Sequence, residues 1–272
     1  MTLYHFSGAG NNFIVLDGRN ADMSAYRDPS TIVRLCTQYH TDGLMILGIG
    51  ADFTMEFYNP DGSGGMMCGN GGRCIAAFAD YLGIKPSDGN IFHFLAPDGP
   101  HTAELLEKNA EGWTIRLQMK DVSGITPVLG GYFLDTGTRH YVRFVEDVEA
   151  IDIDVEGPRY RHDPAFAPIG ANANFVQRLP GGGIKIRTFE KGVEGETLAC
   201  GTGITASAIA SWYDDGVKEI SPLASLGRND NVHTPVRARQ DDLCVDFTPE
   251  GNDIFTGVYL TGPATILAKY EN

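Results

Sequence analysis

The sequence predicts an α/β (α+β) protein of two pseudo-symmetric domains, each a mostly antiparallel curled sheet or barrel around a central buried helix. Three observations support this prediction. A block made of a strand, a glycine-rich turn, Cys-Gly-x-Gly and an apolar helix occurs twice, at Cys68 and at Cys200. Short runs rich in β-branched and aromatic residues recur between turn residues elsewhere. The 272 residues also suffice for two domains of moderate size.

The two copies of the repeat align without a gap when Cys68 is placed on Cys200. FTMEFY, beginning at Phe53, then corresponds to KIRTFE, beginning at Lys185, and both read as strands. The glycine-rich turns NPDGSGGMM and KGVEGETLA come next. The segments CGNGGRCIAAFADYL and CGTGITASAIASWY are small and apolar almost all round, which predicts helices buried on every side. We expect two similar halves that meet where the cysteine loops face each other.

Strands should dominate the rest of the chain. The candidate runs are NFIVLD, LMILGIG, NIFHFLA, WTIRLQM, YFLDTG, HYVRFV, NFVQRL, LCVDFT, IFTGVYL and TILAKY. Amphipathic helical stretches are few, and we expect them at Pro29 to Tyr39 and, more weakly, at Asp163 to Ala167. Glycine is unusually frequent, with 34 residues, which indicates many tight turns or close backbone approaches.

Charge and hydropathy exclude several classes of partner. The 21 basic and 35 acidic residues give a net charge of −14, and phosphate binding favours a basic surface, so we expect neither nucleic acid nor an anionic membrane as a partner. The first thirty residues lack the features of a signal peptide. The longest uncharged run, Thr197 to Tyr213, is too short and glycine-rich to span a bilayer. The expected location is the cytoplasm.

Five cysteines are an odd number, so a disulfide framework is not expected and each thiol is considered singly. Cys68 and Cys200 each stand at the first residue of a predicted helix, where the unpaired N–H groups and the helix dipole favour a thiolate. The same N–H groups, exposed by the glycines, can hold a carboxylate. One thiolate can remove an α proton while a thiol on the other face delivers one, which suits racemisation or epimerisation without a metal or pyridoxal cofactor.

Other interpretations of the cysteines and glycines are weaker. Cys36 and Cys244 lie in apolar or strand contexts and are expected to be packing residues. Cys68 and Cys74 are separated by five residues, outside the usual zinc spacing, so no metal site is expected. The GNGG and GTG segments lack the fingerprints of phosphate-binding loops. A disulfide between Cys68 and Cys200 would be an inactivating side reaction in a reducing cytosol.

Four separated blocks of residues carry a resemblance to a known family. FSGAGNNFIVLD, FYNPDGSGGMMCGNGGRC, GANANF and RTFEKGVEGETLACGTG resemble diaminopimelate epimerases, which interconvert LL- and meso-2,6-diaminopimelate without a cofactor in lysine and peptidoglycan precursor synthesis. The resemblance implies a homodimer and two domains of similar fold, the first regaining the C-terminal strand. We therefore expect residues 1–120, with a strand at about 262–272, to carry Cys68, and residues 121–261 to carry Cys200.

The resemblance also implies roles for individual residues. Cys68 and Cys200 match the two catalytic bases. The helix starts that bind the carboxylate at the reacting carbon match Gly69, Asn70, Gly201 and Thr202. Further substrate-binding positions match Asn11, Asn59, Asn172 and Glu190. Glu190 and His140 match positions that tune the two thiols electrostatically.

Two departures from the family pattern concern the far end of the substrate. The chain has Glu190-Lys191 where the family commonly has Glu-Arg, and Gly-Thr-Arg-His at 137–140 where Gly-Asn-Pro-His or Gly-Ser-Pro-His is common. Arginine binds a carboxylate through two parallel hydrogen bonds, whereas lysine offers a point charge. Either Lys191 or Arg139 could therefore bind the distal carboxylate.

Two other functions remain as alternatives. One is a racemase or epimerase of the same fold that acts on another amino acid, such as histidine or a proline derivative. The proline racemase relatives more often have Cys-Gly-His in the first loop, whereas this chain has Cys68-Gly69-Asn70. The other is a non-catalytic amino-acid-binding protein, which would keep the glycine cradles but would not need both cysteines.

Overall fold

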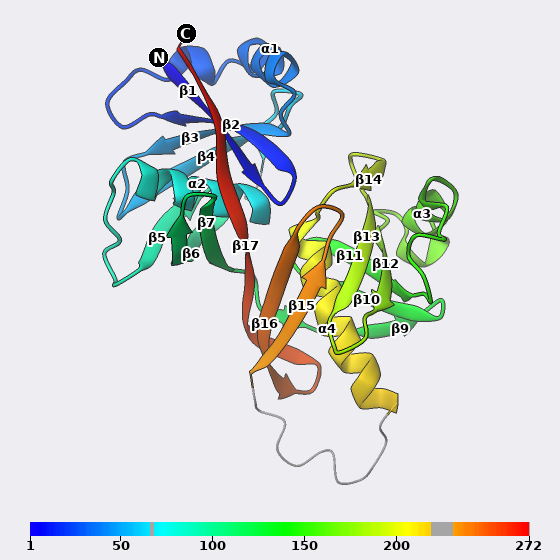
Figure 1. Ribbon diagram of the computed structural model, residues 1–272. Coiled ribbons are helices and arrows are strands. Elements are labelled where there is room, and N and C mark those ends of the chain that lie inside the picture. The colour runs from blue at the N-terminus through cyan, green and yellow to red at the C-terminus, as the bar shows by residue number, and fades with distance from the viewer. Residues whose placement is uncertain (66–67, 219–230, 272) are drawn as a thin grey trace. The chain divides into compact units, whose positions relative to one another are not determined.

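The chain divides into two compact units, which are seen in the computed structural model of Figure 1. The structure describes residues 1–65, 68–218 and 231–271. Unit 1 consists of Met1–Gln118 and Thr261–Asn272, and unit 2 of Met119–Leu260. The domains expected from the sequence have nearly the same bounds: residues 1–120 with a strand at about 262–272 for the first domain, and residues 121–261 for the second.

In unit 1 the described strands form a closed barrel around a helix. The strands are β1 (Thr2–Gly8), β2 (Asn11–Asp17), β3 (Gly43–Gly48), β4 (Phe53–Tyr58), β5 (Ile91–Ala96), β6 (Gly99–Asn109), β7 (Gly112–Gln118) and the end of β17 (Ile254–Glu271). Successive strands from β1 to β7 pair as neighbours, and β17 pairs with both β1 and β7, which closes the ring. The pairs β2/β3 and β4/β5 are parallel, and β1/β2, β3/β4, β5/β6, β6/β7 and β1/β17 are antiparallel.

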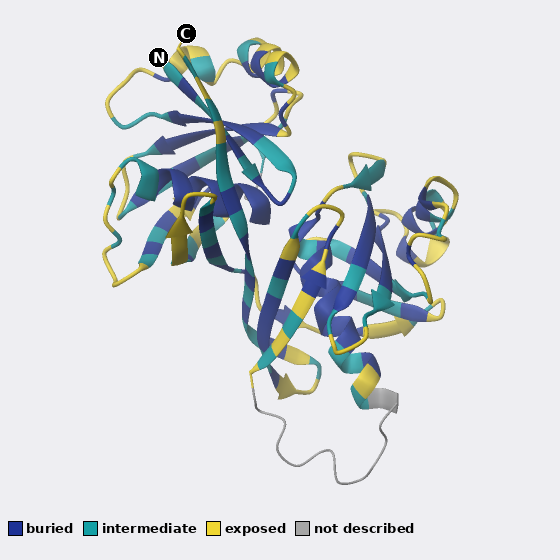
Figure 2. Ribbon diagram, viewed as in Figure 1, coloured by how far each residue is buried: buried dark blue, intermediate teal, exposed yellow. Residues whose placement is uncertain are grey.

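Helix α2 (Gly69–Tyr81) lies inside this barrel. Every residue from Gly69 to Ala79 is buried, and Figure 2 shows the helix in dark blue. The helix contacts β1, β2, β3, β6 and β7. A second helix, α1 (Pro29–Tyr39), covers the outside of unit 1 with Ile32, Leu35 and Cys36 facing the sheet. It starts at Asp28, whose carboxylate accepts a hydrogen bond from Thr31 N at 3.0 Å, and its bounds confirm the predicted helix.

Unit 2 has the same plan. Its elements are β8 (Val122–Ser123), β9 (Thr126–Val128), β10 (Gly131–Asp135), β11 (Arg139–Phe144), α3 (Ile153–Arg161), β12 (Asn172–Arg178), β13 (Ile184–Glu190), β14 (Gly195–Thr197), α4 (Gly201–Lys218), β15 (Val232–Arg237), β16 (Asp242–Gly251) and the start of β17. Helix α4 is the central helix, in contact with β10, β11, β12, β13, β15 and β16. Figure 2 shows its first turns buried.

The pairing pattern makes the internal symmetry explicit. In unit 1 the pairs β1/β2, β2/β3, β3/β4, β4/β5 and β5/β6 are antiparallel, parallel, antiparallel, parallel and antiparallel. In unit 2 the pairs β10/β11, β11/β12, β12/β13, β13/β15 and β15/β16 repeat this order. The fold class predicted from the Cys-Gly-x-Gly repeat is thereby confirmed, with α2 and α4 at equivalent places.

One helix prediction was wrong. The stretch from Asp163 to Ala167 forms only a single 3₁₀ turn, Pro164–Phe166, and the real helix is α3, which precedes it. Sequence reasoning missed α3 because Gly157 and Pro158 lie inside it, and both residues disfavour a helix. The glycine is explained by packing: a Cβ at Gly157 would lie 2.4 Å from the ring of Phe189 on β13. Close packing on β13 therefore offsets the poor local propensity.

One strand is longer than the sequence indicated. IFTGVYL and TILAKY, expected as separate strands, are parts of the continuous strand β17, although Gly257 and Pro263 interrupt its pattern. Its first part, up to Leu260, belongs to unit 2, and its second part, from Thr261, belongs to unit 1.

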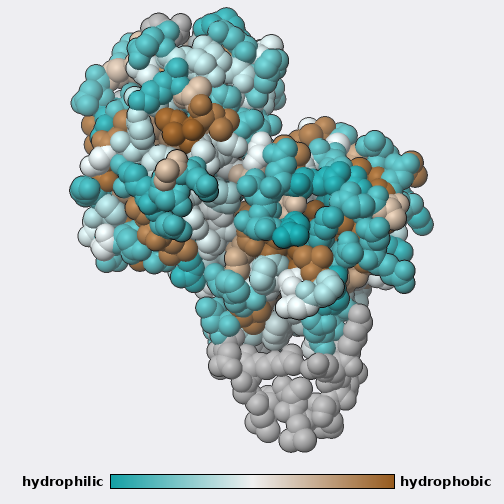
Figure 3. Space-filling model, viewed as in Figure 1, coloured by the Kyte–Doolittle hydropathy of each residue, from teal (hydrophilic) through white to brown (hydrophobic). Residues whose placement is uncertain are grey.

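Exposed apolar side chains come from several elements. The most exposed include Ile49, at 75%, and Val155 and Val193, each at 61%. On the face drawn in Figure 3, hydrophobic residues form small patches among hydrophilic ones.

No helix within the described ranges is long and apolar enough to cross a bilayer. The expected homodimer stays a prediction.

Candidate active site

Cys68 caps the first turn of α2. Its backbone is extended, with φ −105° and ψ 144°, and its sulfur accepts a hydrogen bond from Gly71 N at 3.2 Å. The intrahelical pattern begins when Gly72 N donates to Cys68 O at 2.8 Å. The thiol thus occupies the position that a serine or aspartate oxygen usually takes at a helix N-terminus. A backbone donor and the positive end of the helix dipole both favour the thiolate there.

A tight hairpin brings Asn11 to this helix start. Ala9 and Gly10 link β1 to β2 with φ values of 55° and 88°, the pattern of a two-residue type I′ turn. A Cβ at Gly8 would lie 2.8 Å from the Asn70 carbonyl oxygen, so the turn can sit directly against α2. Asn70 Nδ2 donates to Asn11 Oδ1 at 2.5 Å. Two predicted site residues that are 59 positions apart in the sequence are therefore in contact.

Arg73 supports the same helix start and was not singled out by sequence reasoning. Its guanidinium is fully buried and donates to Asn70 Oδ1 at 2.8 Å, to Gly69 O at 3.3 Å and to Pro263 O at 3.3 Å. Because Asn70 Oδ1 accepts from Arg73, the amide nitrogen of Asn70 must face Asn11. The signal that could have revealed Arg73 is a charged residue in the first turns of a helix predicted to be buried on every side, in GNGGRC.

Cys200 precedes α4 in the same way in unit 2. Ile204 N donates to Cys200 O at 2.8 Å, so the N–H groups of Gly201, Thr202 and Gly203 precede the intrahelical pattern. The Cys200 side chain is mostly covered, with 7% of the residue exposed. Its sulfur lies 3.5 Å from Thr202 Oγ1, which in turn is 2.9 Å from His140 Nε2.

The hydrogen bonds around His140 determine which ring nitrogen carries the proton. His140 is fully buried, and burial lowers its pKa to about 3, so the ring is neutral at physiological pH. Asn174 Nδ2 lies 3.1 Å from His140 Nδ1, and the orientation of this amide is fixed because the same Nδ2 donates at 2.9 Å to the Tyr141 carbonyl oxygen, which can only accept. An amide N–H can only donate, so Nδ1 is the acceptor and the proton is on Nε2.

The direction of the remaining bonds follows from this tautomer. The His140 Nε2–H faces the hydroxyl oxygens of Thr138 and Thr202, both at 2.9 Å, while the Asn172 amide at 3.5 Å is too distant to compete. A threonine hydroxyl that accepts from His140 still has its own proton to donate. The chain from Asn174 through His140 and Thr202 can therefore end with an O–H donor at the sulfur of Cys200, which favours its thiolate.

Gly71 and Gly203 occupy equivalent places three residues after each cysteine, with different surroundings. A Cβ at Gly203 would lie 2.5 Å from Asn174 Oδ1 and 3.2 Å from His140 Cε1. A Cβ at Gly71 would meet the flexible Met45 sulfur at 3.2 Å and the Cys68 sulfur at 3.4 Å. The second glycine of each Cys-Gly-x-Gly motif thus leaves space that a Cβ would fill, and a Cβ would come closer to its neighbours in unit 2 than in unit 1.

Asn172, Glu190 and Lys191 are brought together at the ends of β12 and β13. Asn172 Nδ2 donates to Arg139 O at 3.0 Å, and its Oδ1 accepts from Lys191 N at 2.8 Å. Glu190 accepts a hydrogen bond from Thr197 Oγ1 at 2.8 Å. The Lys191 side chain is exposed to solvent. The amide of Asn172 thus fixes the backbone of Lys191 at the start of the loop that leads through β14 to Cys200.

Arg139 and Asn59 are engaged in local contacts. Arg139 donates to Phe166 O at 3.0 Å, and its guanidinium carbon lies 5.0 Å from the centre of the Phe133 ring. Asn59 begins a turn, with its backbone N–H donating to Ser63 O at 2.9 Å and its Nδ2 to Ser63 Oγ at 3.0 Å. This turn belongs to the loop between β4 and α2.

The other thiols have different environments. Cys74 and Cys36 are buried, and burial raises the pKa of both thiols, so they stay protonated. Cys244 lies beside His233 on the β15/β16 hairpin, with 3.1 Å between its sulfur and His233 Nδ1.

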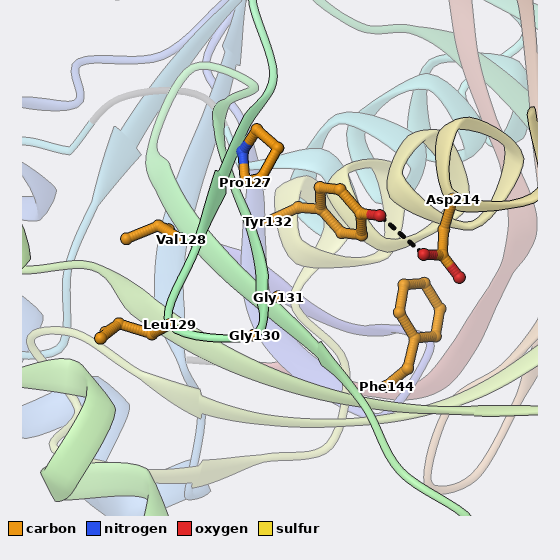
Figure 4. A pocket seen from close by; sticks show the side chains of 8 residues that line it. All are labelled: Pro127, Val128, Leu129, Gly130, Gly131, Tyr132, Phe144 and Asp214. Carbon is orange, nitrogen blue, oxygen red and sulfur yellow. Dashed lines mark hydrogen bonds between the residues drawn. The ribbon is translucent and has the colours of Figure 1, made fainter. Parts of the chain in front are cut away.

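A surface pocket of unit 2, drawn in Figure 4, does not contain the predicted site residues. It lies along the loop from Pro127 to Tyr132, with Phe144 and Asp214 on its other side. Tyr132 donates its phenolic O–H to Asp214 at 2.6 Å, and Arg178 binds the same carboxylate at 2.6 Å. These bonds connect β10 and β12 to α4, so the polar groups at this pocket serve to hold the central helix in place.

Solved structures share this fold at low sequence identity. A PhzF-family phenazine biosynthesis protein from Bacillus anthracis matches with a TM-score of 0.72 at 12% identity, covering 100% of this chain and 98% of that one. A hydroxyproline epimerase from Agrobacterium vitis matches with a TM-score of 0.62 at 13% identity, covering 99% and 90%.

Sequence comparisons are more specific. The profile of the diaminopimelate epimerase family matches residues 132–267. A diaminopimelate epimerase from Flavobacterium psychrophilum is 37% identical over 97% of both chains. One from Aquifex aeolicus is 36% identical, covering 94% of this chain and 93% of the relative. With these matches and two helix starts that each present a cysteine, the chain belongs to the diaminopimelate epimerase family.

Proposed function

We propose that this chain is an isomerase that interconverts LL- and meso-2,6-diaminopimelate without a cofactor, with Cys68 and Cys200 as its two acid–base groups. Membership of the family supports the reaction. The observation that carries the mechanism is the repeated placement of a cysteine at the start of a buried central helix, once in each unit.

The reaction needs a base on one face of the α carbon and an acid on the other. A thiolate removes the α proton and becomes a thiol, and the C–H electron pair remains on the substrate as a carbanion. The second thiol then delivers its proton to the opposite face and becomes a thiolate. The configuration at carbon is inverted, and the reverse reaction exchanges the two roles. The mechanism requires that one sulfur reaches each face when substrate is bound.

The α-carboxylate must be held firmly, because it accepts part of the negative charge as the proton leaves. First-turn N–H groups provide suitable donors, and we assign this task to Gly69 and Asn70 in unit 1 and to Gly201 and Thr202 in unit 2. Asn11 and Asn59 are assigned to the polar groups of the substrate. Asn11 is held in place through Asn70 and Arg73.

The two sulfurs accept hydrogen bonds from different donors. At Cys200, the Asn174–His140–Thr202 chain supplies an O–H donor to the thiolate. At Cys68, the donor is Gly71 N. His140 therefore acts on Cys200 through Thr202, as a positioning residue rather than as a base, since a ring with a pKa of about 3 does not take up a proton at neutral pH. Glu190 is assigned to the substrate ammonium or to tuning of a thiol.

The distal carboxylate is assigned to Lys191. Arg139 is engaged with Phe166 O and with the Phe133 ring, whereas the Lys191 side chain is exposed and its backbone is fixed by Asn172. Lys191→Met should lower kcat/KM on diaminopimelate. The corresponding loss of transition-state stabilisation should be about 1.5–3 kcal/mol, because a hydrogen bond to a charged group is lost. Lys191→Arg should be tolerated. If Arg139→Met carries the loss and Lys191→Met does not, the assignment is wrong.

Stereochemistry in deuterated water tests the reaction itself. Reduced, cofactor-free protein is incubated with LL-diaminopimelate in D₂O, with lysine, proline and histidine in parallel. We expect meso product with deuterium at the inverted carbon, and little exchange in lysine, because the groups that bind the distal centre would be left unpaired. Turnover of proline or histidine with an inert diaminopimelate would instead identify a racemase or epimerase with another substrate.

The assembly and location of the protein are further expectations. We expect a homodimer in the cytoplasm. Analytical ultracentrifugation over a range of protein concentrations would measure the oligomeric state, and a monomer at all concentrations would contradict the first expectation.

A further inference from the structure

Outside the epimerase residues, the β15/β16 hairpin of unit 2 carries a group of metal-ligating side chains. In the antiparallel register, His233 pairs directly with Asp246, and Pro235 pairs with Cys244. Cys244 and Asp246 are two residues apart on β16, so their side chains point to the same face as that of His233. Figure 1 shows β15 and β16 side by side.

The ligand atoms are close to one another. His233 Nδ1 lies 2.8 Å from Asp246 Oδ1, and the Cys244 sulfur lies 3.1 Å from Nδ1 and 3.3 Å from Nε2 of the same ring. One ligand atom from each residue can be chosen so that all lie within 4.8 Å of one another. Tetrahedral zinc with ordinary bond lengths places its ligand atoms roughly 3.2–3.7 Å apart. Small side-chain rotations therefore suffice to make room for an ion.

We propose that His233, Cys244 and Asp246 form a binding site for a zinc-type divalent cation. The donor set is one imidazole nitrogen, one thiolate and one carboxylate, which suits a borderline-soft ion and disfavours magnesium or calcium. Binding releases the thiol proton of Cys244 to solvent as the sulfur–metal bond forms. Three protein ligands leave a fourth coordination position for water.

Burial gives the site an anchored side and an accessible side. Asp246 is buried, Cys244 is half-buried, and the His233 side chain is 66% exposed. The carboxylate and thiol are thus held by the strand, while the imidazole can turn toward an arriving ion. A histidine–aspartate pair outside this trio, His101 and Asp98, lies 3.0 Å apart and provides a control. Among the described residues, the hairpin trio is the one group of three or more such ligands.

The site would fasten the hairpin rather than take part in proton transfer. Its ligands come from two neighbouring strands that both contact α4, and none of them is a residue assigned to the epimerase reaction. An ion there crosslinks β15 to β16 and stabilises the folded chain by an amount that grows with the logarithm of the free metal concentration once this exceeds Kd.

Cobalt titration of the full-length, reduced, metal-free protein tests the site, because a cobalt–thiolate bond gives a near-ultraviolet charge-transfer band. We expect one equivalent to bind with this band, and the band to be retained in His101→Gln and in the Cys68→Ala/Cys200→Ala double variant. Cys244→Ser should abolish the band. Asp246→Asn and His233→Gln should weaken binding about 10-fold or more.

Thermal unfolding with zinc gives a second readout that does not depend on the spectrum. Zinc should raise the unfolding temperature of the native chain and of the double variant, and leave that of Cys244→Ser unchanged, while the three proteins unfold similarly in EDTA. The proposal is overturned if the native chain shows no saturable cobalt–thiolate band below about 100 µM metal. It is equally overturned if the band is lost in the double variant and kept in Cys244→Ser.

Discussion

The two units surround their helix-start cysteines with different side chains. Each presents a cysteine at the start of a buried central helix, followed by glycine and an intrahelical pattern that begins four residues after the cysteine. In unit 1 the next polar residue is Asn70, held by Arg73 and bonded to Asn11. In unit 2 it is Thr202, bonded to His140 and close to the cysteine sulfur.

This difference separates what the backbone supplies from what the side chains supply. The helix start gives both units N–H donors and a dipole, because the first turn of any helix has them. The side-chain support then differs: amides and a guanidinium orient polar groups near Cys68, while a hydroxyl chain reaches Cys200. We therefore expect substitutions at equivalent positions to have unequal effects.

Removing either sulfur should have the largest effect. Cys68→Ala and Cys200→Ala should each lower epimerisation by about 10²–10⁴-fold, since each removes one of two acid–base groups. Each variant should still exchange the α hydrogen of one stereoisomer in D₂O through its remaining thiol, and the two variants should prefer opposite stereoisomers. Circular dichroism would confirm that both fold. A near-native rate in either folded variant would disprove the two-base mechanism.

The buried histidine should give unit 2 a pH-dependent stability that the Asn11–Asn70 contact in unit 1 does not have. Burial lowers the pKa of His140 from 6.5 to about 3, so between these values the unfolded chain binds a proton that the folded chain does not. The free energy of unfolding therefore falls as the pH is lowered from about 6.5 toward 3, and His140 adds no pH dependence above this range.

Comparison with His140→Gln isolates this contribution. The carboxylates are common to both proteins, so the difference in their pH dependence belongs to position 140. Urea unfolding at several pH values between 4 and 8 should show a flatter profile for the variant below pH 6.5. If the two profiles run parallel, His140 takes up its proton over the same pH range in the folded and the unfolded chain, and its pKa is not lowered by burial.

Adding one methyl group at the equivalent glycines should distinguish the two helix starts. Gly203→Ala places a Cβ 2.5 Å from Asn174 Oδ1 and should destabilise the fold by about 1–3 kcal/mol, as overpacking does. Gly71→Ala faces a flexible methionine and gains helix propensity, so its cost should be under about 1 kcal/mol. Denaturant unfolding of the two variants measures both values. Equal costs would indicate that the His140–Asn174 network can move aside.

The smallest effect on catalysis is expected at Thr202. Thr202→Val removes the hydroxyl near Cys200 and should lower kcat about 10-fold, with the acidic limb of the pH–rate profile moving to higher pH because the thiolate loses a donor. Thr138→Val is the matched control, since the Thr138 hydroxyl bonds to His140 and Thr202. A similar shift in the control, or none in either, would argue against Thr202 as the immediate donor.

The sequence was most informative where a local pattern repeats. The α2 start at Gly69 and the α4 start at Gly201 follow from the Cys-Gly-x-Gly pair, because glycine and an all-round apolar helix are local signals. Helix α1 was predictable from its Asp28 cap and its proline at the first position. These features need no knowledge of distant residues.

What could not be predicted depends on pairing between distant segments. The contact between Asn174 and His140 depends on the parallel register of β11 and β12, in which His140 lies opposite Asn172. The trio at His233 requires the register of β15 and β16. Cys244 was therefore expected only to pack, since no local spacing connects it to His233. Helix α3 was missed because its glycine is explained by a partner on β13.

Strand β17 has a consequence for synthesis of the protein. The barrel of unit 1 closes only when the residues from Thr261 onward pair with β1 and β7, yet the ribosome makes all of unit 2 before them. Until then β1 and β7 are open edges of a nascent sheet, exposed to pairing with other chains. Unit 2 can pair its strands while unit 1 is still incomplete, so the segment that closes the barrel of unit 1 is made only after all of unit 2.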